Sequence, residues 1–348
     1  MSNLRLFGIL IGVCTLLYTF LKYRGPQWKR SNFILLSTFS VLLTLTCVNP
    51  NFVNFARDML SLQEYLYGRI LALLILSNVF LFFFTAYLKS NQGITDIQLD
   101  KLIRSIAASS ITNIKDDVSR IKPIMILIPA YNEADNLKEL LPEMPDQING
   151  VKVGVLVIDD GSMDGTSQVV RDQGCLVASN PVNRGGGAAL RLGYDILKKI
   201  GCEICVTMDA DGQHQPRQMI HLVQPILNND YDVVIGSRII GDREKDSLFR
   251  LLGVYVFGTV ISLLLGKKIT DPSSNYRAFR MEAMDSIHLY ENQYHTSELI
   301  IEAVKKDMSI GEVPITIMKR KYGKSKKGKD IIYGLNFTKT IIKTWWRK

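Results

Sequence analysis

Hydrophobic residues are arranged differently in the first quarter of the chain and in the rest. Three long stretches there carry no charged residue: between Arg5 and Lys22, from Ser31 to Ala56, and from Ile70 to Leu88. A membrane-crossing helix needs about 20 apolar residues. The pattern therefore predicts an all-α transmembrane domain over residues 1–89, with spans at about 5–22, 32–50 and 69–89.

The charges beside these stretches predict how the chain crosses the membrane. A cleaved signal peptide is the alternative for the first stretch, but the basic loop LKYRGPQWKR follows it in place of a small-residue cleavage site. That loop has four Lys or Arg residues and no acid, whereas the next loop is balanced. The positive-inside bias then predicts an integral membrane protein with its N-terminus outside and everything after Lys89 in the cytoplasm. Any homo-oligomer is expected to form through the spans.

The pattern changes after the third stretch. Residues 90–120 read as a polar linker around an amphipathic helix capped by Thr95 or Asp96, with Leu99, Leu102, Ile103 and Ile106 on its apolar face. Over 121–327, short apolar runs alternate with helical stretches: IMILIPA, GVLVIDD, EICVTMDA and YDVVIGS. Strands buried on both faces and separated by helices predict an α/β domain with a Rossmann-like, mostly parallel sheet.

Two further apolar stretches lie near the end of the chain. Residues 251–266 are uncharged but short and glycine-containing, which favours a buried or membrane-skimming helix over a fourth span. The net charge of +9 is concentrated from Lys319 onward, where eleven Lys or Arg residues accompany one acid. Within 328–348, Ile331, Leu335, Ile342, Trp345 and Trp346 share one helical face, and Lys339, Lys343 and Arg347 flank it. This pattern predicts a basic amphipathic helix at a lipid surface rather than a nucleic-acid tail, because no nucleic-acid-binding motif accompanies the charge.

Cysteine and histidine give little chemistry. The five cysteines form no disulfide framework, and Cys202-x-x-Cys205 lacks the second pair that a zinc site requires. The four histidines show no metal-binding spacing, so we expect solvated or hydrogen-bonded roles for them.

The predicted strands end in polar residues. PAYNE, DDGSMDGT, DADGQ and GSR follow the four apolar runs, and ligands of parallel sheets bind at the carboxyl ends of strands. Asp209 and Asp211 lie one residue apart, so both can point at one place. Neighbouring carboxylates repel unless a cation lies between them, and Mg²⁺ or Mn²⁺ with substrate phosphates suits such a pair. A polar turn that caps the following helix is the alternative.

Seven motifs in order, PAYNE, VIDDGSMDGT, NRGGGAALR, DADGQH, GSR, DPSSNYRAF and RKYGKSK, resemble those of family 2 glycosyltransferases of the GT-A fold. They are most similar to the polyprenyl-phosphate sugar transferases, such as dolichyl-phosphate mannose and glucose synthases. The resemblance covers about 200 residues, from Lys122 to Lys326. It implies transfer of a monosaccharide from a UDP- or GDP-sugar to a dolichyl or undecaprenyl phosphate, with inversion. The membrane spans precede the catalytic domain here, whereas in that family they often follow it.

The resemblance also assigns residues. Asp209 and Asp211 match the metal-binding pair on the donor diphosphate, with Gln213 as third ligand. Positions that hold the base and ribose of the nucleotide sugar are matched by Pro129, Tyr131, Glu133 and Asp160. Glycine at Gly185 and Gly187 would let the backbone approach the diphosphate closely. Arg238, Arg320 and Lys326 match the acceptor-phosphate positions, and Arg250 and Arg277 are weaker candidates. Of these, Asp209, Asp211, Arg238 and Arg320 are the expected catalytic residues.

Two positions depart from the family pattern. Gly186 stands where many relatives have Lys, so any positive charge it gave the donor must come from Arg184 or Arg191, or be absent. Asn275 stands at a usual Gly, which leaves the roles of Ser274 and Asn275 open.

Further residues bear on which acceptor or other function the chain has. A lipid phosphate is already anionic near neutral pH and needs cations more than a general base. The competing acceptor is a sugar hydroxyl of a glycolipid or polysaccharide, for which Glu298 lies in the region of a base; the QxxRW motif of processive synthases is missing. A non-catalytic relative would be expected to have broken motifs. The glycine-rich segment lacks the Lys-Ser/Thr of a P-loop, and Leu190 replaces the third Gly or Ala of a dinucleotide fingerprint.

Overall fold

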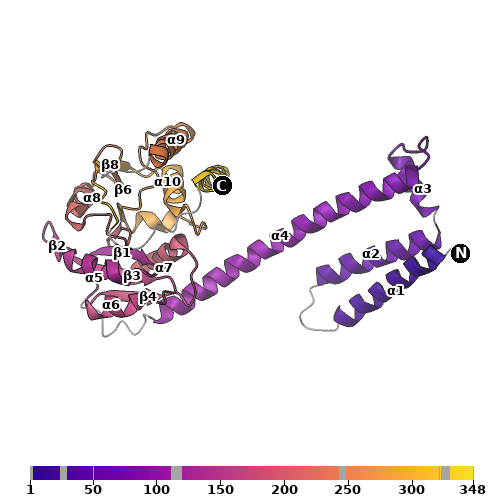
Figure 1. The fold of residues 1–348 in the computed structure, drawn as a ribbon, viewed down its shortest axis with the longest axis horizontal. Coiled ribbons are helices and arrows are strands. Elements are labelled where there is room, and N and C mark those ends of the chain that lie inside the picture. Colours follow the sequence, from indigo (N-terminus) through magenta and orange to yellow (C-terminus); the bar gives the residue numbers. More distant parts are fainter. Residues whose placement is uncertain are drawn as a thin grey trace. The chain divides into compact units, whose positions relative to one another are not determined.

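The protein forms two compact units, which comprise residues up to Ile97 and residues from Gln98 onward (Figure 1). The computed structural model describes residues 3–23, 30–49, 51–110, 120–242, 248–320, 322 and 330–347.

The first unit is helical. It contains α1 (Asn3–Tyr23), α2 (Arg30–Val48), α3 (Phe52–Met59) and the first part of α4 (Gly68–Ser110). Helices α1 and α2 pack against each other at small residues: a Cβ atom at Gly12 would lie 2.3 Å from Thr44 Oγ1. Close approach of this kind is typical of helix pairs in membranes.

The predicted spans correspond to these helices in part. Among the described residues, Arg5–Tyr23 and Gly68–Ala108 are long and apolar enough to cross a membrane. The segment predicted as the second span qualifies only if Phe33–Val48 and Phe52–Met59, bent by 103° relative to each other, count as one crossing. By length and composition the unit therefore offers two or three crossings.

Helix α4 continues through the segment predicted to be a linker. Thr95 and Asp96 lie inside this helix, so the predicted cap at either residue is wrong. On the predicted apolar face, Leu99 and Leu102 are 52% and 55% exposed and Ile103 is half-buried. The buried face near the end of α4 is instead formed by Ala107 and Ala108, small residues that allow the helix to pack closely onto the second unit's core, to which they belong.

The second unit is built on one mixed sheet. Its strands occur in the spatial order β2-β3-β1-β5-β7-β6-β8, and β4 also pairs with β3. The pairs β1–β3, β1–β5, β3–β4 and β6–β8 are parallel, and β7 is antiparallel to both β5 and β6. The strands are β1 (Ile124–Ala130), β2 (Gln147–Ile148), β3 (Val151–Asp159), β4 (Leu176–Ser179), β5 (Ile204–Thr207), β6 (Val233–Ser237), β7 (Arg277–Arg280) and β8 (Ile310–Pro314). The four strands expected from the sequence, β1, β3, β5 and β6, are confirmed.

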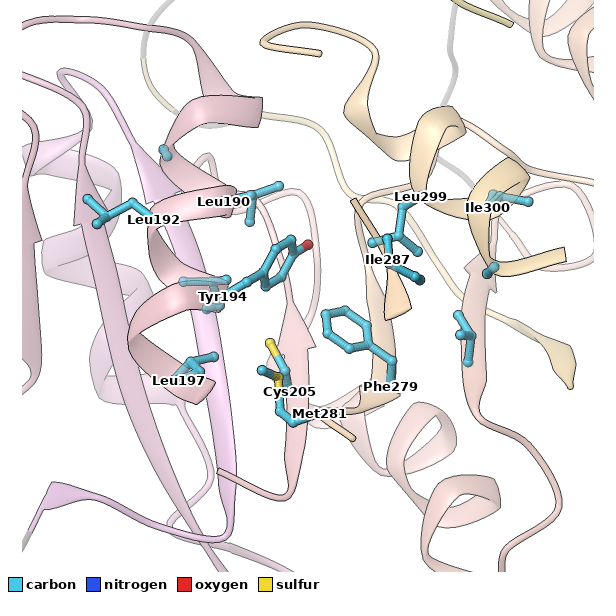
Figure 2. Packing of buried hydrophobic residues seen from close by; sticks show 14 of the residues in the cluster. Leu190, Leu192, Tyr194, Leu197, Cys205, Phe279, Met281, Ile287, Leu299 and Ile300 are labelled. Atoms are coloured by element: carbon cyan, nitrogen blue, oxygen red, sulfur yellow. The ribbon is translucent and has the colours of Figure 1, made fainter. Parts of the chain in front are cut away.

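Helices cover both faces of this sheet. They are α5 (Ala134–Leu140), α6 (Thr166–Asp172), α7 (Gly186–Lys199), α8 (Met219–Leu227), α9 (Leu248–Leu265), α10 (His295–Lys305) and α11 (Asp330–Trp346), with short 3-10 turns at Leu141–Glu143, Pro216–Gln218 and Ala283–Ser286. Alternate residues of β1 enter different cores: Leu127 faces the cluster that includes α7 and α10, and Ile126 faces the one that includes α5 and α8. Figure 2 shows part of the first cluster, where Tyr194 of α7 meets Phe279 of β7 with ring centroids 5.4 Å apart. Burial on both faces explains the continuous apolar runs in the sequence.

The two late apolar helices each have one buried face. In α9, Ile261 is fully buried whereas Leu263 is 79% exposed. In α11, Phe337 and Ile341 pack into the core, and Trp346 on another face is 78% exposed. Both helices therefore combine packing onto the domain with exposed apolar side chains.

Candidate active site

Asp209 and Asp211 follow β5 at the rim of the sheet. Asp209 Oδ1 accepts a hydrogen bond of 2.8 Å from Asn275 Nδ2, and the Asp209 backbone N–H donates to His214 Nδ1 at 3.1 Å. His214 is buried and stacks on Tyr276 with ring centroids 4.8 Å apart. The Asp209 side chain and its turn are thus held from two sides, and the prediction of a hydrogen-bonded histidine is confirmed for His214.

The two acids of the pair influence each other's charge. Burial and the neighbouring Asp209 carboxylate raise the pKa of Asp211 to about 6, against lowering by the Gln213 backbone N–H and Arg320. A cation between the two carboxylates would favour their charged forms.

Gln213 lies beside the pair and is tied to the chain's later segment. Its Nε2 donates to the Met318 carbonyl at 3.0 Å, and the Met318 N–H donates back to the Gln213 carbonyl at 2.9 Å. This pairing brings Arg320 near the acids: Arg320 Nη1 lies 3.7 Å from Asp211 Oδ2.

The donor set suits a divalent ion that also binds substrate oxygens. In the described part of the chain, no three His, Cys, Asp or Glu side chains gather where they could hold a metal ion. Two carboxylates and an amide oxygen leave coordination positions open, and Mg²⁺ commonly fills such positions with phosphate oxygens and water. The residues fit a metal that is completed by a diphosphate.

Glu133 and Arg320 join two motifs that are far apart in the sequence. Glu133, directly before α5, is buried, and its two carboxylate oxygens accept bonds of 2.5 and 2.7 Å from Arg320 Nη2. Asn136 donates to the same carboxylate at 2.6 Å. The structure thus places a predicted donor-binding residue in contact with a predicted acceptor-phosphate residue, at the edge of the acidic pair.

Asp160 organises the glycine-rich segment. Its carboxylate accepts bonds from the backbone N–H groups of Arg184 and Gly185, at 3.0 and 2.7 Å, and from Asn180 at 2.8 Å. Burial raises the pKa of Asp160 although these bonds oppose the rise. Gly185 has a φ of 92°, a conformation that favours glycine. Pro129 ends β1 with Ala130, and Tyr131 follows it, so the predicted nucleotide-binding residues lie at neighbouring strand ends.

Arg238, expected at the acceptor phosphate, is paired within the protein. Its Nε and Nη2 bind the two oxygens of the buried Asp271 at 2.6 and 3.0 Å, and Nη2 also donates to Ser273. Arg238 holds the pKa of Asp271 below its usual value even though burial acts to raise it. This fork fixes the guanidinium next to the DPSSN segment.

The weaker arginine candidates fare differently. Arg277 is 1% exposed and donates to the carbonyls of Thr296 and Pro272, so its suggested role at an acceptor phosphate is wrong: the group is enclosed in the core. Arg250 lies in the first turn of α9, but its side chain is outside the described residues, as is Lys326 altogether.

Glu298 is not placed as a general base. It is fully buried and accepts bonds from the backbone N–H groups of Tyr290 and Glu291, and Arg347 of α11 pairs with it at 2.9 Å. These partners give it a structural role at the α10–α11 contact. The sequence contains no local signal for this pair, because its members are 49 residues apart.

Sequence reasoning left two site residues unassigned or missed. The sequence assigns no role to Asn275, whereas in the structure Asn275 donates to Asp209 Oδ1 and so orients that carboxylate. Asp271, the partner of Arg238, was not singled out, although an acid at the start of a motif that also contains serines was a usable signal.

Solved structures with the same fold support this description of the domain. Crystal structures of glucosyl-3-phosphoglycerate synthase from Mycobacterium tuberculosis are similar to this chain. The complex with Mn²⁺, uridine diphosphate and phosphoglyceric acid matches with a TM-score of 0.52 and 18% identity, over 67% of this chain and 81% of that one. The complex with Mg²⁺ and uridine diphosphate gives a TM-score of 0.51 and 19% identity, over 66% and 81%. The domain therefore has the GT-A fold, as the sequence predicts.

Sequence comparison is more specific. The profile of glycosyl transferase family 2 matches residues 125–287. An uncharacterised protein of Methanocaldococcus jannaschii is 34% identical over 63% of this chain and 90% of its own length. UDP-N-acetylglucosamine–dolichyl-phosphate N-acetylglucosaminyltransferase of Methanococcus voltae is 31% identical over 61% and 92%, and polyprenol monophosphomannose synthase of Mycolicibacterium smegmatis is 31% identical over 61% and 84%. This chain belongs to glycosyltransferase family 2.

Proposed function

We propose that this protein transfers a monosaccharide from a nucleotide sugar to a polyprenyl phosphate. The observation that carries the proposal is the meeting of Asp209, Asp211, Glu133 and Arg320 at one rim of the sheet. Carboxylates predicted to bind the nucleotide sugar and an arginine predicted to bind the lipid phosphate thus lie in one network of ion pairs. The names of the Methanococcus and Mycolicibacterium relatives support a lipid phosphate as acceptor.

On the donor side, the acids would act through a divalent ion. Asp209 and Asp211, with the Gln213 amide oxygen, would hold Mg²⁺ or Mn²⁺, which when bound neutralises the diphosphate leaving group. Asn275 fixes the direction of the Asp209 carboxylate, since it donates to Oδ1. Tyr131, Glu133 and Asp160 would contact the base and ribose, and the backbone around Gly185 would lie against the diphosphate.

On the acceptor side, the chain would supply cations. Arg238 and Arg320 would orient a lipid phosphate, whose oxygen attacks the anomeric carbon as the bond from that carbon to the diphosphate oxygen breaks. The product is a lipid-phosphate-linked sugar with inverted configuration, and a nucleoside diphosphate leaves. Because the attacking oxygen is already anionic, no proton has to be removed. The burial of Glu298 against Arg347 agrees with a reaction that needs no base there.

The membrane arrangement is part of the proposal. The apolar helices of the first unit would anchor the chain, with the N-terminus outside and the catalytic unit in the cytoplasm, as the basic first loop predicts. The exposed Trp346 and Ile342 of α11 would rest in the bilayer surface, where lipid headgroups lie. A homo-oligomer through the spans stays a prediction.

A comparison of acceptors tests this function. The purified full chain should be given Mn²⁺ or Mg²⁺, a panel of UDP- and GDP-sugars, and a short polyprenyl phosphate, the matching polyprenol, or a glycolipid. We expect labelled sugar on the polyprenyl phosphate alone. Transfer to the glycolipid hydroxyl with none to the phosphate would establish the alternative acceptor and overturn the proposal.

A further inference from the structure

Asp100 is an acid on α4 that binds three arginines. It pairs with Arg104 Nε at 2.8 Å on its own helix, with Arg191 Nη2 at 3.2 Å, and with Arg184. Its side chain is only 15% exposed. All of these residues belong to the second unit. Asp100 is therefore an enclosed acid that holds three arginines together, not a solvated charge on a helix surface.

Two of these arginines border the glycine-rich segment. Arg184 precedes Gly185, and its backbone N–H and that of Gly185 donate to Asp160. Arg191 lies in α7, the helix that the segment opens. Asp100 therefore binds an arginine at each end of the segment, whereas Asp160 binds the backbone N–H groups at its start.

Arg191 extends the connection to the loop before α10. It donates to the Glu291 carbonyl at 2.9 Å and also to Asn292 Oδ1. The Asn292 carbonyl in turn accepts a bond of 2.8 Å from the Gly187 N–H. Asn292 thus holds the backbone of the segment on a second side, and Arg191, a partner of Asp100, binds Asn292.

Electrostatics makes the acid necessary for this geometry. The side chains of Arg184 and Arg191 are 12% and 6% exposed, so two guanidinium charges are enclosed close together. Nη1 of Arg184 is buried and has no hydrogen-bond partner among the residues that the structure describes. Enclosed like charges without an anion are strongly unfavourable. If Asp100 lost its charge, at least one arginine would have to move toward water and pull the segment with it.

We infer that Asp100 is a positioning residue for the donor: through Arg184 and Arg191 it fixes the glycine-rich segment against which a nucleoside diphosphate binds. The inference rests on the proposed donor site. It concerns a residue before the 125–287 range that the family profile matches. It also gives the Arg184 and Arg191 side chains a role other than replacing the lysine that is absent at Gly186.

Nucleotide binding to the full chain provides the test, with activity as a second readout. Asp100→Asn should weaken binding of UDP or GDP with Mn²⁺ by about tenfold and raise the donor KM in parallel, because a small displacement of binding groups is costly. The KM for polyprenyl phosphate should stay within about twofold. Asp195→Asn is the matched control: the Asp195 carboxylate pairs with Arg104 at 2.7 Å, is 47% exposed, and among the described residues makes no ion pair with the glycine-rich segment.

Two more variants guard against a folding defect. Asp100→Glu keeps the charge but moves it, so we expect nucleotide affinity between those of the wild type and Asp100→Asn. Arg184→Gln should weaken binding, and adding Asp100→Asn to it should cost less than the same change costs in the wild type.

The outcomes are decisive. Any of three results would overturn the inference. Folded Asp100→Asn could bind nucleotide as tightly as the wild type, or Asp100→Asn and Asp195→Asn could lose the same nucleotide affinity. In the third, Asp100→Asn would raise the donor KM and the acceptor KM in parallel. If Asp100→Asn does not fold, either of two results would overturn the inference: wild-type nucleotide affinity in Asp100→Glu, or losses from Asp100→Glu and Arg184→Gln that add fully in the double variant. A wild-type chain that binds neither nucleotide would instead refute the proposed donor site.

Discussion

Gly186 and Gly187 are adjacent in the sequence but should respond very differently to substitution by alanine. A Cβ atom at Gly187 would lie 2.2 Å from the Glu291 carbonyl oxygen and 2.9 Å from that of Asn292. Both are backbone atoms, and the Gly187 N–H already binds the second of them. A Cβ atom at Gly186 would meet only His295 Cε1, at the ordinary contact distance of 3.6 Å.

The magnitude follows from these distances. Gly187→Ala must push the 291–292 backbone away, and overpacking costs about 1–3 kcal/mol. Losing the Gly187 hydrogen bond adds about 1 kcal/mol. Gly186→Ala should instead stabilise the first turn of α7 by up to about 1 kcal/mol, because alanine has less freedom in the unfolded chain. The gain from replacing glycine applies to both variants and cancels in their difference, so we expect the two variants to differ by about 2–4 kcal/mol.

Thermal unfolding of the full chain in detergent, followed by tryptophan fluorescence, measures the difference. Gly187→Ala should unfold several degrees below wild type and bind nucleotide more weakly, because the shifted backbone belongs to the loop that Arg191 holds. Gly186→Ala should unfold at or above the wild-type temperature. Equal unfolding temperatures for the two variants would refute the packing described for this segment.

Three further changes follow from the ion pairs and exposed side chains. The Arg238 pair stabilises the wild type above the usual carboxyl pKa, and this stabilisation is lost as pH falls through the lowered pKa of Asp271. Asp271→Asn should remove it, so the free energy of unfolding of the variant should depend less on pH in acid. An unchanged pH dependence in acid would contradict the Arg238 pair. Glu298→Gln should lower the unfolding temperature through the loss of the Arg347 pair but keep kcat within about tenfold; a thousandfold loss, of about the size that removal of a base can give, would restore its role as a base. In nanodiscs, brominated lipid should quench Trp346 fluorescence, and Trp346→Ala should abolish that part of the quenching, whereas equal quenching would exclude lipid contact.

The sequence was sufficient where local pattern decides structure. Strands β1, β3, β5 and β6 are buried on both faces, so each appears as a short apolar run. The polar residues after those runs lie at the sheet's rim because parallel strands end together, which explains why Asp209 and Glu133 were identified. The turn after β5 was also recognisable from Asp211 and Gly212.

Features that depend on distant partners could not be read from the sequence. Strand β7 has arginine at both ends, Arg277 and Arg280, and its antiparallel insertion between β5 and β6 is set by tertiary pairing. Glu298 resembles a catalytic acid in isolation, and only the fold brings Arg347 to it. The polar residues after Lys89 suggest a linker, but α4 continues through them, and Asp100 and Arg104 there find partners on α7.

The most direct measurement of the central claim is sugar transfer to polyprenyl phosphate with and without a divalent ion. The wild-type chain should form lipid-linked sugar with Mn²⁺ or Mg²⁺ and lose this activity in chelator. Asp209→Asn should remain folded, because asparagine retains the oxygen that accepts the Asn275 bond, yet form no product with metal present. Full turnover in chelator, or by Asp209→Asn, would contradict the account.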